Sequence, residues 1–119
     1  MKLRTLIICA AIGLIVFGNA CKAKKTITAE CVGFAPSYTA DIKPIIDDNC
    51  AKGCHSAANH AGGVDLSTYA AVKTISGEAR FLGAIRHLAG FDAMPMKAPK
   101  LSDSTIRVIN CWIQNGTPE

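Results

Sequence analysis

Several features that would assign a fold or an activity are missing from this sequence of 119 residues. No internal repeat appears, and no stretch alternates convincingly between apolar and polar residues with the period of two that marks a strand. The formal net charge is +4, but from Cys31 onward eight basic residues balance eight acidic ones, so nothing indicates nucleic-acid binding. No arrangement of Ser, His and Asp suggests nucleophilic catalysis. The function must therefore be sought in the motifs that are present.

Only one long apolar run occurs, and it lies at the start of the chain. Residues 1–4 contain two basic residues, residues 5–17 are apolar, and residues 18–20 are small or polar. This is the pattern of a secretory signal with a cleavage site. The apolar run is shorter than the roughly 20 residues that a permanent membrane anchor requires. We therefore expect residues 1–20 to be a signal peptide and the protein to be exported.

Cys21 directly follows this segment and resembles the lipid acceptor of bacterial lipoproteins. Lipoprotein signals usually carry Leu three residues before that cysteine, whereas this chain has Gly18, so ordinary cleavage after Ala20 is the alternative. We expect lipidation of Cys21. Residues 21–36 then form a polar tether, basic at its start, and residues 37–119 form a single small domain.

Four helices are predicted for that domain, and they cover residues 42–49, 67–75, 80–88 and 102–115. Thr39 or Asp41 can cap the first, and Pro44 is tolerable only in its first turn. Ser67 can cap the second. The expected fold is all-α, with Trp112 packed between the first and last helices.

Loops are expected over residues 56–64 and 91–101, because the first contains glycines and the second contains Pro95 and Pro99. The second loop also carries two methionines. Both loops therefore connect helices without contributing a strand of their own.

The residues with the clearest chemistry are Cys50, Cys54 and His55, which form a C-x-x-x-C-H motif at the end of the first predicted helix. The usual attachment motif for c-type haem is C-x-x-C-H, one residue shorter. Two thiols can bond the two vinyl groups of a haem while the adjacent imidazole binds the iron. A structural zinc site that adds His60, or an incidental pair of thiols, is the alternative.

A second iron ligand is expected from the loop of residues 91–101, where Met94 precedes Pro95. A thioether ligand raises the reduction potential of a haem relative to two imidazoles. Met96 is the nearest rival, and His87 would give ligation by two histidines. Lys97 and Lys100 follow in the same loop, either as ordinary solvated side chains or as a surface that steers an acidic partner.

Cys31 and Cys111 remain after the other four of the six cysteines have been assigned to the signal, the lipid and the haem motif. An exported compartment permits disulfides, so we expect these two to pair. At about 100° per residue, Cys111 lies opposite the apolar stripe of the last helix, where it can meet Cys31. Two unpaired thiols are the alternative.

Taken together, these motifs resemble single-haem class I cytochromes c, within them bacterial lipoprotein domains with a widened attachment motif. The resemblance spans about residues 38–118 and is carried by DIKPII at residues 41–46, GGVDLSTY at 62–69, Met-Pro at 94–95 and Trp-Ile at 112–113. It implies helices around one covalent haem c, with the first and last helices crossing. It further implies His55 and Met94 as axial ligands and electron transfer in the bacterial envelope.

The expected function is that of a one-electron carrier rather than an enzyme. It would be exported to the periplasmic side, held to a membrane by the lipid on Cys21, and serve redox partner proteins of the envelope. A haem enzyme or gas sensor with an open distal site is one alternative. A structural lipoprotein stabilised by zinc or a disulfide is another.

Overall fold

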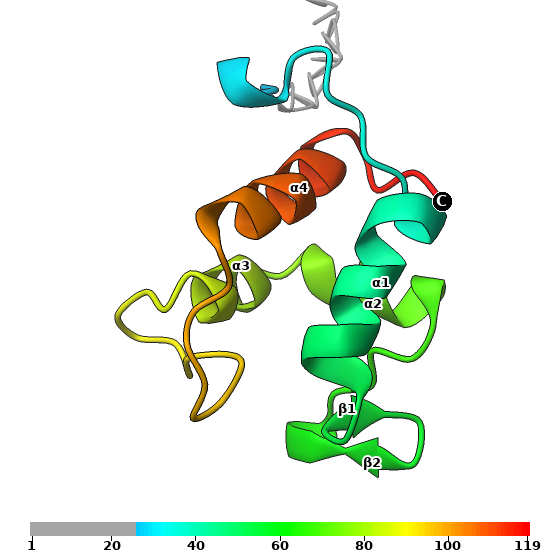
Figure 1. The fold of residues 1–119 in the computed structure, drawn as a ribbon, viewed down its shortest axis with the longest axis vertical. Coiled ribbons are helices and arrows are strands. Elements are labelled where there is room, and N and C mark those ends of the chain that lie inside the picture. Colours follow the sequence, from blue (N-terminus) through cyan, green and yellow to red (C-terminus); the bar gives the residue numbers. More distant parts are fainter. Residues whose placement is uncertain (1–25) are drawn as a thin grey trace, which may run out of the picture.

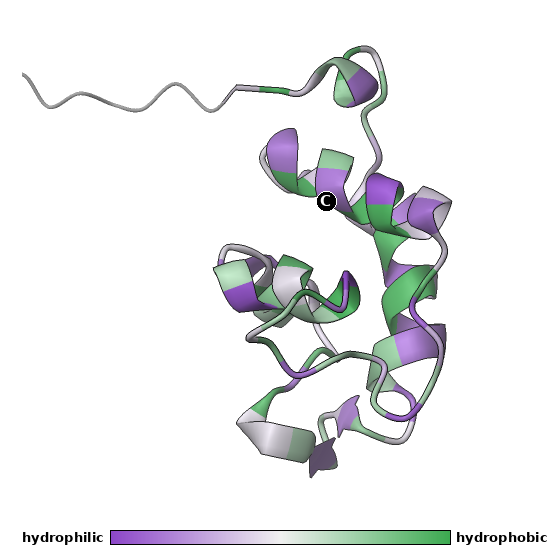
Figure 2. Ribbon diagram, turned by 90° about the vertical axis from the view of Figure 1, so that its left-hand side faces the viewer, coloured by the Kyte–Doolittle hydropathy of each residue, from purple (hydrophilic) through white to green (hydrophobic). Residues whose placement is uncertain are grey.

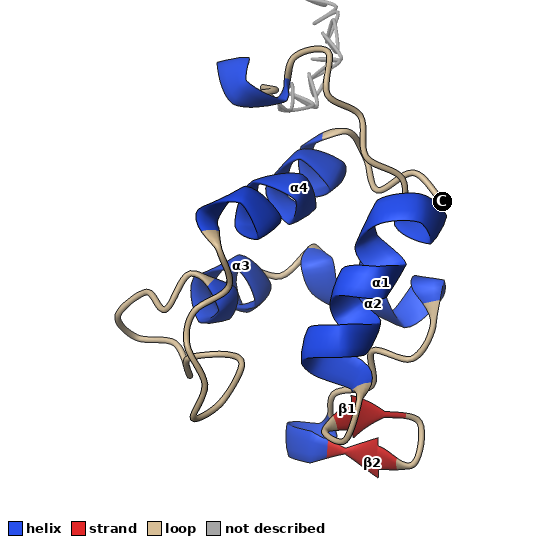
Figure 3. Cartoon of the chain, viewed as in Figure 1, coloured by secondary structure: helices blue, strands red, loops and turns tan. Residues whose placement is uncertain are grey.

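The computed structural model describes residues 26–119, so the predicted signal peptide, the lipid site Cys21 and the lysines at 22, 24 and 25 lie outside the described residues. The described part is largely helical, with four α-helices and one short β-hairpin (Figures 1 and 3). The expectation of an all-α fold is therefore met only in part. Among residues 26–119, no helix is both long and apolar enough to cross a membrane.

The first helical segment covers residues 38–51 and is longer than the predicted 42–49. It consists of a π-helical turn, Tyr38–Ile42, helix α1, Lys43–Ile46, and a second π-helical turn, Asp47–Ala51. The cap is Ser37, whose side chain accepts a hydrogen bond from the Ala40 amide, rather than Thr39 or Asp41. Pro44 has no N–H to donate to a carbonyl. It can nevertheless lie beyond the start of the segment, because a π-helical turn, which is wider than an α-helical turn, precedes it.

A hairpin replaces the first part of the loop predicted at residues 56–64. Strand β1, His55–Ser56, pairs antiparallel with strand β2, Asn59–His60, and a short 3-10 turn, Ala61–Gly63, follows. The Ala61 amide donates to the carbonyl of Cys54 at 3.0 Å. Strands of two residues are too short to leave a periodic pattern, which is why the sequence did not reveal them. The hairpin therefore fixes the backbone positions of the residues that follow Cys54.

The remaining helices are α2, Tyr69–Ser76, α3, Ala79–Ile85, and α4, Asp103–Gln114. Thr68, rather than Ser67, caps α2 by accepting from the Ala71 amide, and Ser102 caps α4 by accepting from Thr105. Helix α3 ends before the predicted residue 88. The reason is that His87 adopts a left-handed backbone conformation, with φ of +54°.

The core lies between the first helical segment and α4. Trp112 packs there, as predicted. Its side chain is fully buried, and its ring lies 6.1 Å from that of Tyr38. Figure 2 shows hydrophobic and hydrophilic residues alternating along the helices, so each helix turns one face to the core. The buried set includes Ile42, Ile46, Val72 and Ile109. The two ends of the folded chain are thereby packed together.

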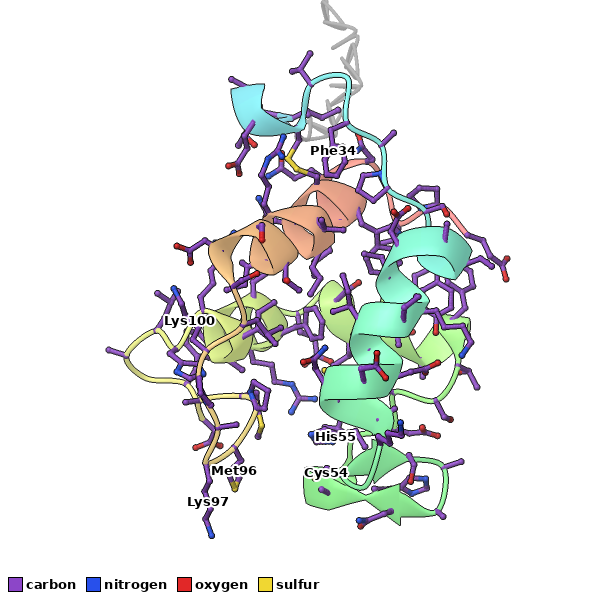
Figure 4. All side chains as sticks on the ribbon, in the orientation of Figure 1. Phe34, Cys54, His55, Met96, Lys97 and Lys100 are labelled. Atoms are coloured by element: carbon purple, nitrogen blue, oxygen red, sulfur yellow. A yellow bond between two sulfur atoms is a disulfide. The ribbon has the colours of Figure 1, made fainter. Side chains whose placement is uncertain are left out.

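Cys31 and Cys111 form a disulfide across 80 positions of sequence, the pairing expected from the cysteine count. The segment around Cys31 lies over α4 (Figure 1), and Arg107 of α4 stacks over the ring of Phe34 at 4.8 Å (labelled in Figure 4). The Arg107 guanidinium also donates to the carbonyl of Glu30 at 2.6 Å. Because this segment covers α4, Cys111 is buried although it lies opposite the apolar stripe.

Candidate functional site

A cavity of about 400 Å³ opens between the hairpin end of the first helical segment and the loop that follows α3. The residues that line it come from both sides and are mostly apolar, among them Val64, Leu66, Phe81 and Ile85. The predicted site residues on its wall are Cys50, Cys54, His55, Met94 and Met96. Figure 4 shows Cys54 and His55 at the hairpin and Met96 on the loop of residues 91–101. The fold thus gathers two separate motifs around one space.

The two thiols of the motif have different environments. Cys50 lies in the last turn of the first helical segment and is half-buried, whereas Cys54 lies in the exposed turn before β1. Burial raises the pKa of the Cys50 thiol to about 11. Between them Gly53 has a φ of +87°, a conformation that glycine adopts at no steric cost. This turn lets both cysteines reach the cavity wall.

His55 is oriented by the backbone of the segment after the hairpin. Its Nδ1 lies 3.1 Å from the carbonyl oxygen of Val64, and its own carbonyl accepts from the Leu66 amide at 2.8 Å. A carbonyl oxygen can only accept, so Nδ1 carries a proton, and in the neutral ring Nε2 then holds the lone pair. A histidine whose Nδ1–H is held by a backbone carbonyl is the usual form of a metal ligand that binds through Nε2.

Met94 lies on the opposite side of the cavity in a loop whose backbone is tied to α3. Its amide donates to the carbonyl of Ala84 at 3.1 Å, and its carbonyl accepts from His87 Nε2 at 3.1 Å. Met94 is half-buried, whereas Met96 is 63% exposed. His87 does not line the cavity. Of the three candidates for a second ligand, Met94 is therefore the one that is both on the wall and held in place.

Of the residues named for the alternative zinc site, His60 does not line the cavity. His60 is exposed on β2, and its Nε2 lies 3.7 Å from a carboxylate oxygen of Asp65. Within residues 26–119 no group of three or more His, Cys, Asp or Glu side chains is close enough to hold a metal ion. The geometry therefore gives no support to zinc bound by Cys50, Cys54, His55 and His60.

Sequence reasoning did not single out Arg80 or Phe91 as site residues, yet both line the cavity. Arg80 belongs to α3, and its Nε lies 2.5 Å from a carboxylate oxygen of Glu78. The two loop lysines do not line the cavity. Lys100 donates to Asp103 and lowers the pKa of that carboxyl, and Lys97 is exposed (Figure 4).

The residues on the cavity wall thus carry two thiols, an imidazole and a thioether. The thiols can form covalent bonds to an unsaturated group, and the other two are ligands that bind transition metals. Arg80 and Asp92 add one charge of each sign at the wall. No protein-family model, no curated protein and no solved structure matches this chain.

Proposed function

We propose that this chain is an exported one-electron carrier that holds one haem c in the cavity of about 400 Å³. The observation that carries the proposal is the meeting of Cys50, Cys54 and His55 with Met94 on the wall of a single cavity. These residues come from two segments that local structure alone would not bring together. The proposed fold is that of a small cytochrome c-like domain.

The cavity suits a large flat cofactor that is mostly apolar and carries two carboxylates. Its volume lies within the range of about 300 to 1,000 Å³ that is usual for ligand sites, and its lining is chiefly aliphatic and aromatic. The propionate groups of a haem need a cation, and Arg80 is the arginine on this wall. A domain of this size also gains from a large cofactor that supplements its small core.

Cys50 and Cys54 would hold the haem covalently. Each S–H would add across one vinyl group, so that a sulfur–carbon bond forms and the hydrogen moves to the neighbouring carbon. Covalent attachment keeps the cofactor in a site that is open at Cys54, which is exposed. When bound, haem supplies the one-electron chemistry of iron.

His55 and Met94 would bind the iron from opposite sides through Nε2 and the thioether sulfur. The Val64 carbonyl keeps the proton of His55 on Nδ1 and so leaves Nε2 for the metal. The hydrogen bonds to Ala84 and His87 hold the backbone of Met94 at the wall. Two such ligands from the protein would leave a haem iron little room to bind a substrate, so the chemistry that it would supply here is electron transfer.

Export and anchoring are part of the proposal. The disulfide between Cys31 and Cys111 supports an oxidising compartment. The basic, lipid-type sequence around Cys21 would place the domain on the periplasmic side of a membrane, where redox proteins of the envelope would be its partners. Lys97, exposed on the loop beside the cavity, would favour acidic partner surfaces.

The test is to express the full chain with haem-maturation machinery and stain a denaturing gel for haem. We expect stain that survives denaturation, a sharp α-band in the reduced form, and a methionine-to-iron charge-transfer band in the oxidised form. Met94→Ala should abolish that band, whereas the matched variant Met96→Ala should keep it. A colourless protein would overturn the proposal. Covalent haem that binds carbon monoxide readily in the wild type would instead favour an open distal site.

A further inference from the structure

Helix α3 ends in a geometry that normally calls for glycine. The amide of Leu88 donates to the carbonyl of Gly83 at 3.0 Å, and the amide of His87 donates to the carbonyl of Ala84 at 3.1 Å. With Arg86 as the cap, these two bonds make a Schellman motif in which His87 occupies the left-handed position. Its φ is +54°, and a residue other than glycine pays about 1 kcal/mol or more there.

The imidazole of His87 makes a contact that glycine cannot make. Its Nε2 lies 3.1 Å from the carbonyl oxygen of Met94, which can only accept, so Nε2–H is the donor. The Met94 amide donates to the carbonyl of Ala84, which also accepts from the His87 amide. Both polar groups of the Met94 backbone are therefore bound to the end of α3, one through the main chain and one through His87.

We propose that His87 is the positioning residue for Met94. It does not line the cavity itself, but it fixes the backbone from which the Met94 thioether reaches the cavity wall. The inference rests on the proposed function for its consequence at the iron, and it replaces the earlier alternative in which His87 is the second ligand. The left-handed turn alone would favour glycine at residue 87. The hydrogen bond to Met94 requires an imidazole there, and this explains why a histidine occupies a strained backbone position.

Three variants of the haem-loaded full chain separate this role from a merely structural one. His87→Gln keeps an N–H donor at a similar reach, and Gln tolerates the turn no better than His. His87→Leu keeps a bulky side chain without a donor. His87→Gly removes the donor but relieves the left-handed strain, so it should be as thermally stable as the wild type or more so. Met96→Ala serves as a control in the same loop.

The readouts are the charge-transfer band, the reduction potential and hydrogen exchange at the Met94 amide. We expect His87→Leu and His87→Gly to weaken the band and lower the potential. They should also raise the exchange rate of the Met94 amide roughly fivefold, because the loop would then be tied to the end of α3 only by the bond from that amide to Ala84. His87→Gln should restore all three toward the wild type. Loss of the band in the stable glycine variant cannot come from unfolding.

Two results would overturn the inference while leaving the carrier function intact. One is a band and a potential that stay unchanged in both the leucine and glycine variants. The other is an oxidised spectrum altered by His87→Leu but not by Met94→Ala, which would make His87 itself the ligand. A wild type that carries no covalent haem would instead contradict the proposed function. Exchange of the Met94 amide, which donates to Ala84, would still report on how firmly His87 holds this loop against α3.

Discussion

Tyr38 and Trp112 meet at the point where the two ends of the domain join, with 6.1 Å between their rings. The carbonyl oxygen of Pro118 accepts both from the Trp112 indole N–H at 2.8 Å and from the Tyr38 amide at 2.9 Å. The ring of Tyr69 also contacts that of Tyr38, with 5.0 Å between the ring centroids and a tilt of 53°. The first helical segment, α4 and the C-terminal residues are thus held together by one cluster.

Replacing Trp112 should weaken this junction. Trp112→Phe removes the indole donor and part of the ring from a fully buried site, and we expect a loss of about 1 to 3 kcal/mol in the free energy of unfolding. Denaturant titration followed by circular dichroism measures it. Val32→Ala is the matched control, because that side chain is 73% exposed and its loss should stay within about 0.5 kcal/mol. Equal effects of the two changes would contradict the buried junction.

The disulfide should contribute more than any single contact in the core. It closes a loop of 80 residues, for which chain entropy predicts a stabilisation of about 4 to 5 kcal/mol. The double variant Cys31→Ala, Cys111→Ala should therefore unfold at a clearly lower denaturant concentration. Reduction of the wild type by a thiol reagent should have a similar effect. A loss below about 1 kcal/mol in both experiments would show that the segment over α4 adds little to stability.

The two motif thiols should differ in reactivity in the haem-free chain. Since burial raises the pKa of Cys50 from 9.0 to about 11, its thiolate fraction at pH 8 falls by about a hundredfold. Alkylation followed by mass spectrometry should label Cys54→Ser, which retains Cys50, much more slowly than Cys50→Ser, which retains the exposed Cys54. In denaturant the difference should vanish. Equal rates in the folded state would contradict the burial of Cys50.

The same shift has a definite sign in stability. The raised pKa favours the neutral thiol in the folded state, so its contribution is fully present below pH 9 and is lost as the pH rises toward 11. The folded, haem-free wild type should become less stable across that window. Cys50→Ala should not show this part of the dependence, which pH-resolved denaturant titrations can measure.

Gly83 should be intolerant of a side chain because the ring of Phe91 lies against it. A Cβ at residue 83 would come within 2.5 Å of that ring. Gly83→Ala should therefore cost about 1 to 3 kcal/mol of unfolding free energy and displace the loop that carries Met94. In a Phe91→Ala background the same change should be nearly neutral, because the obstacle is gone. Additive costs in this double-mutant cycle would show that the two sites are not in contact.

Much of the local structure could be predicted because it depends on neighbours in sequence. Ser102 begins α4 through its own side chain, and α2 ends at Ser76, one residue beyond its predicted end. The spacing of Cys50, Cys54 and His55 indicated a single site without any knowledge of the fold. The stripe that contains Trp112 likewise predicted which face of the last helix would be buried.

Other features escaped prediction because distant contacts decide them. The first helical segment begins at Tyr38 because Ser37 caps it and the Tyr38 ring packs on Trp112, contacts that override the nearer capping candidates. The hairpin of β1 and β2 is too short for a pattern, and the left-handed turn at His87 is a position where glycine would be expected.

The sequence by itself determined the chemistry of each motif and most of the helices around it, since helical periodicity and capping are local properties of the chain. Only the tertiary structure decided that Met94 faces the same cavity as His55 and that His87 lies behind Met94 rather than on the wall. It also decided which tautomer His55 adopts, through the Val64 carbonyl. Those relationships join residues far apart in sequence, and packing and hydrogen bonding bring such residues together only once the whole chain has folded.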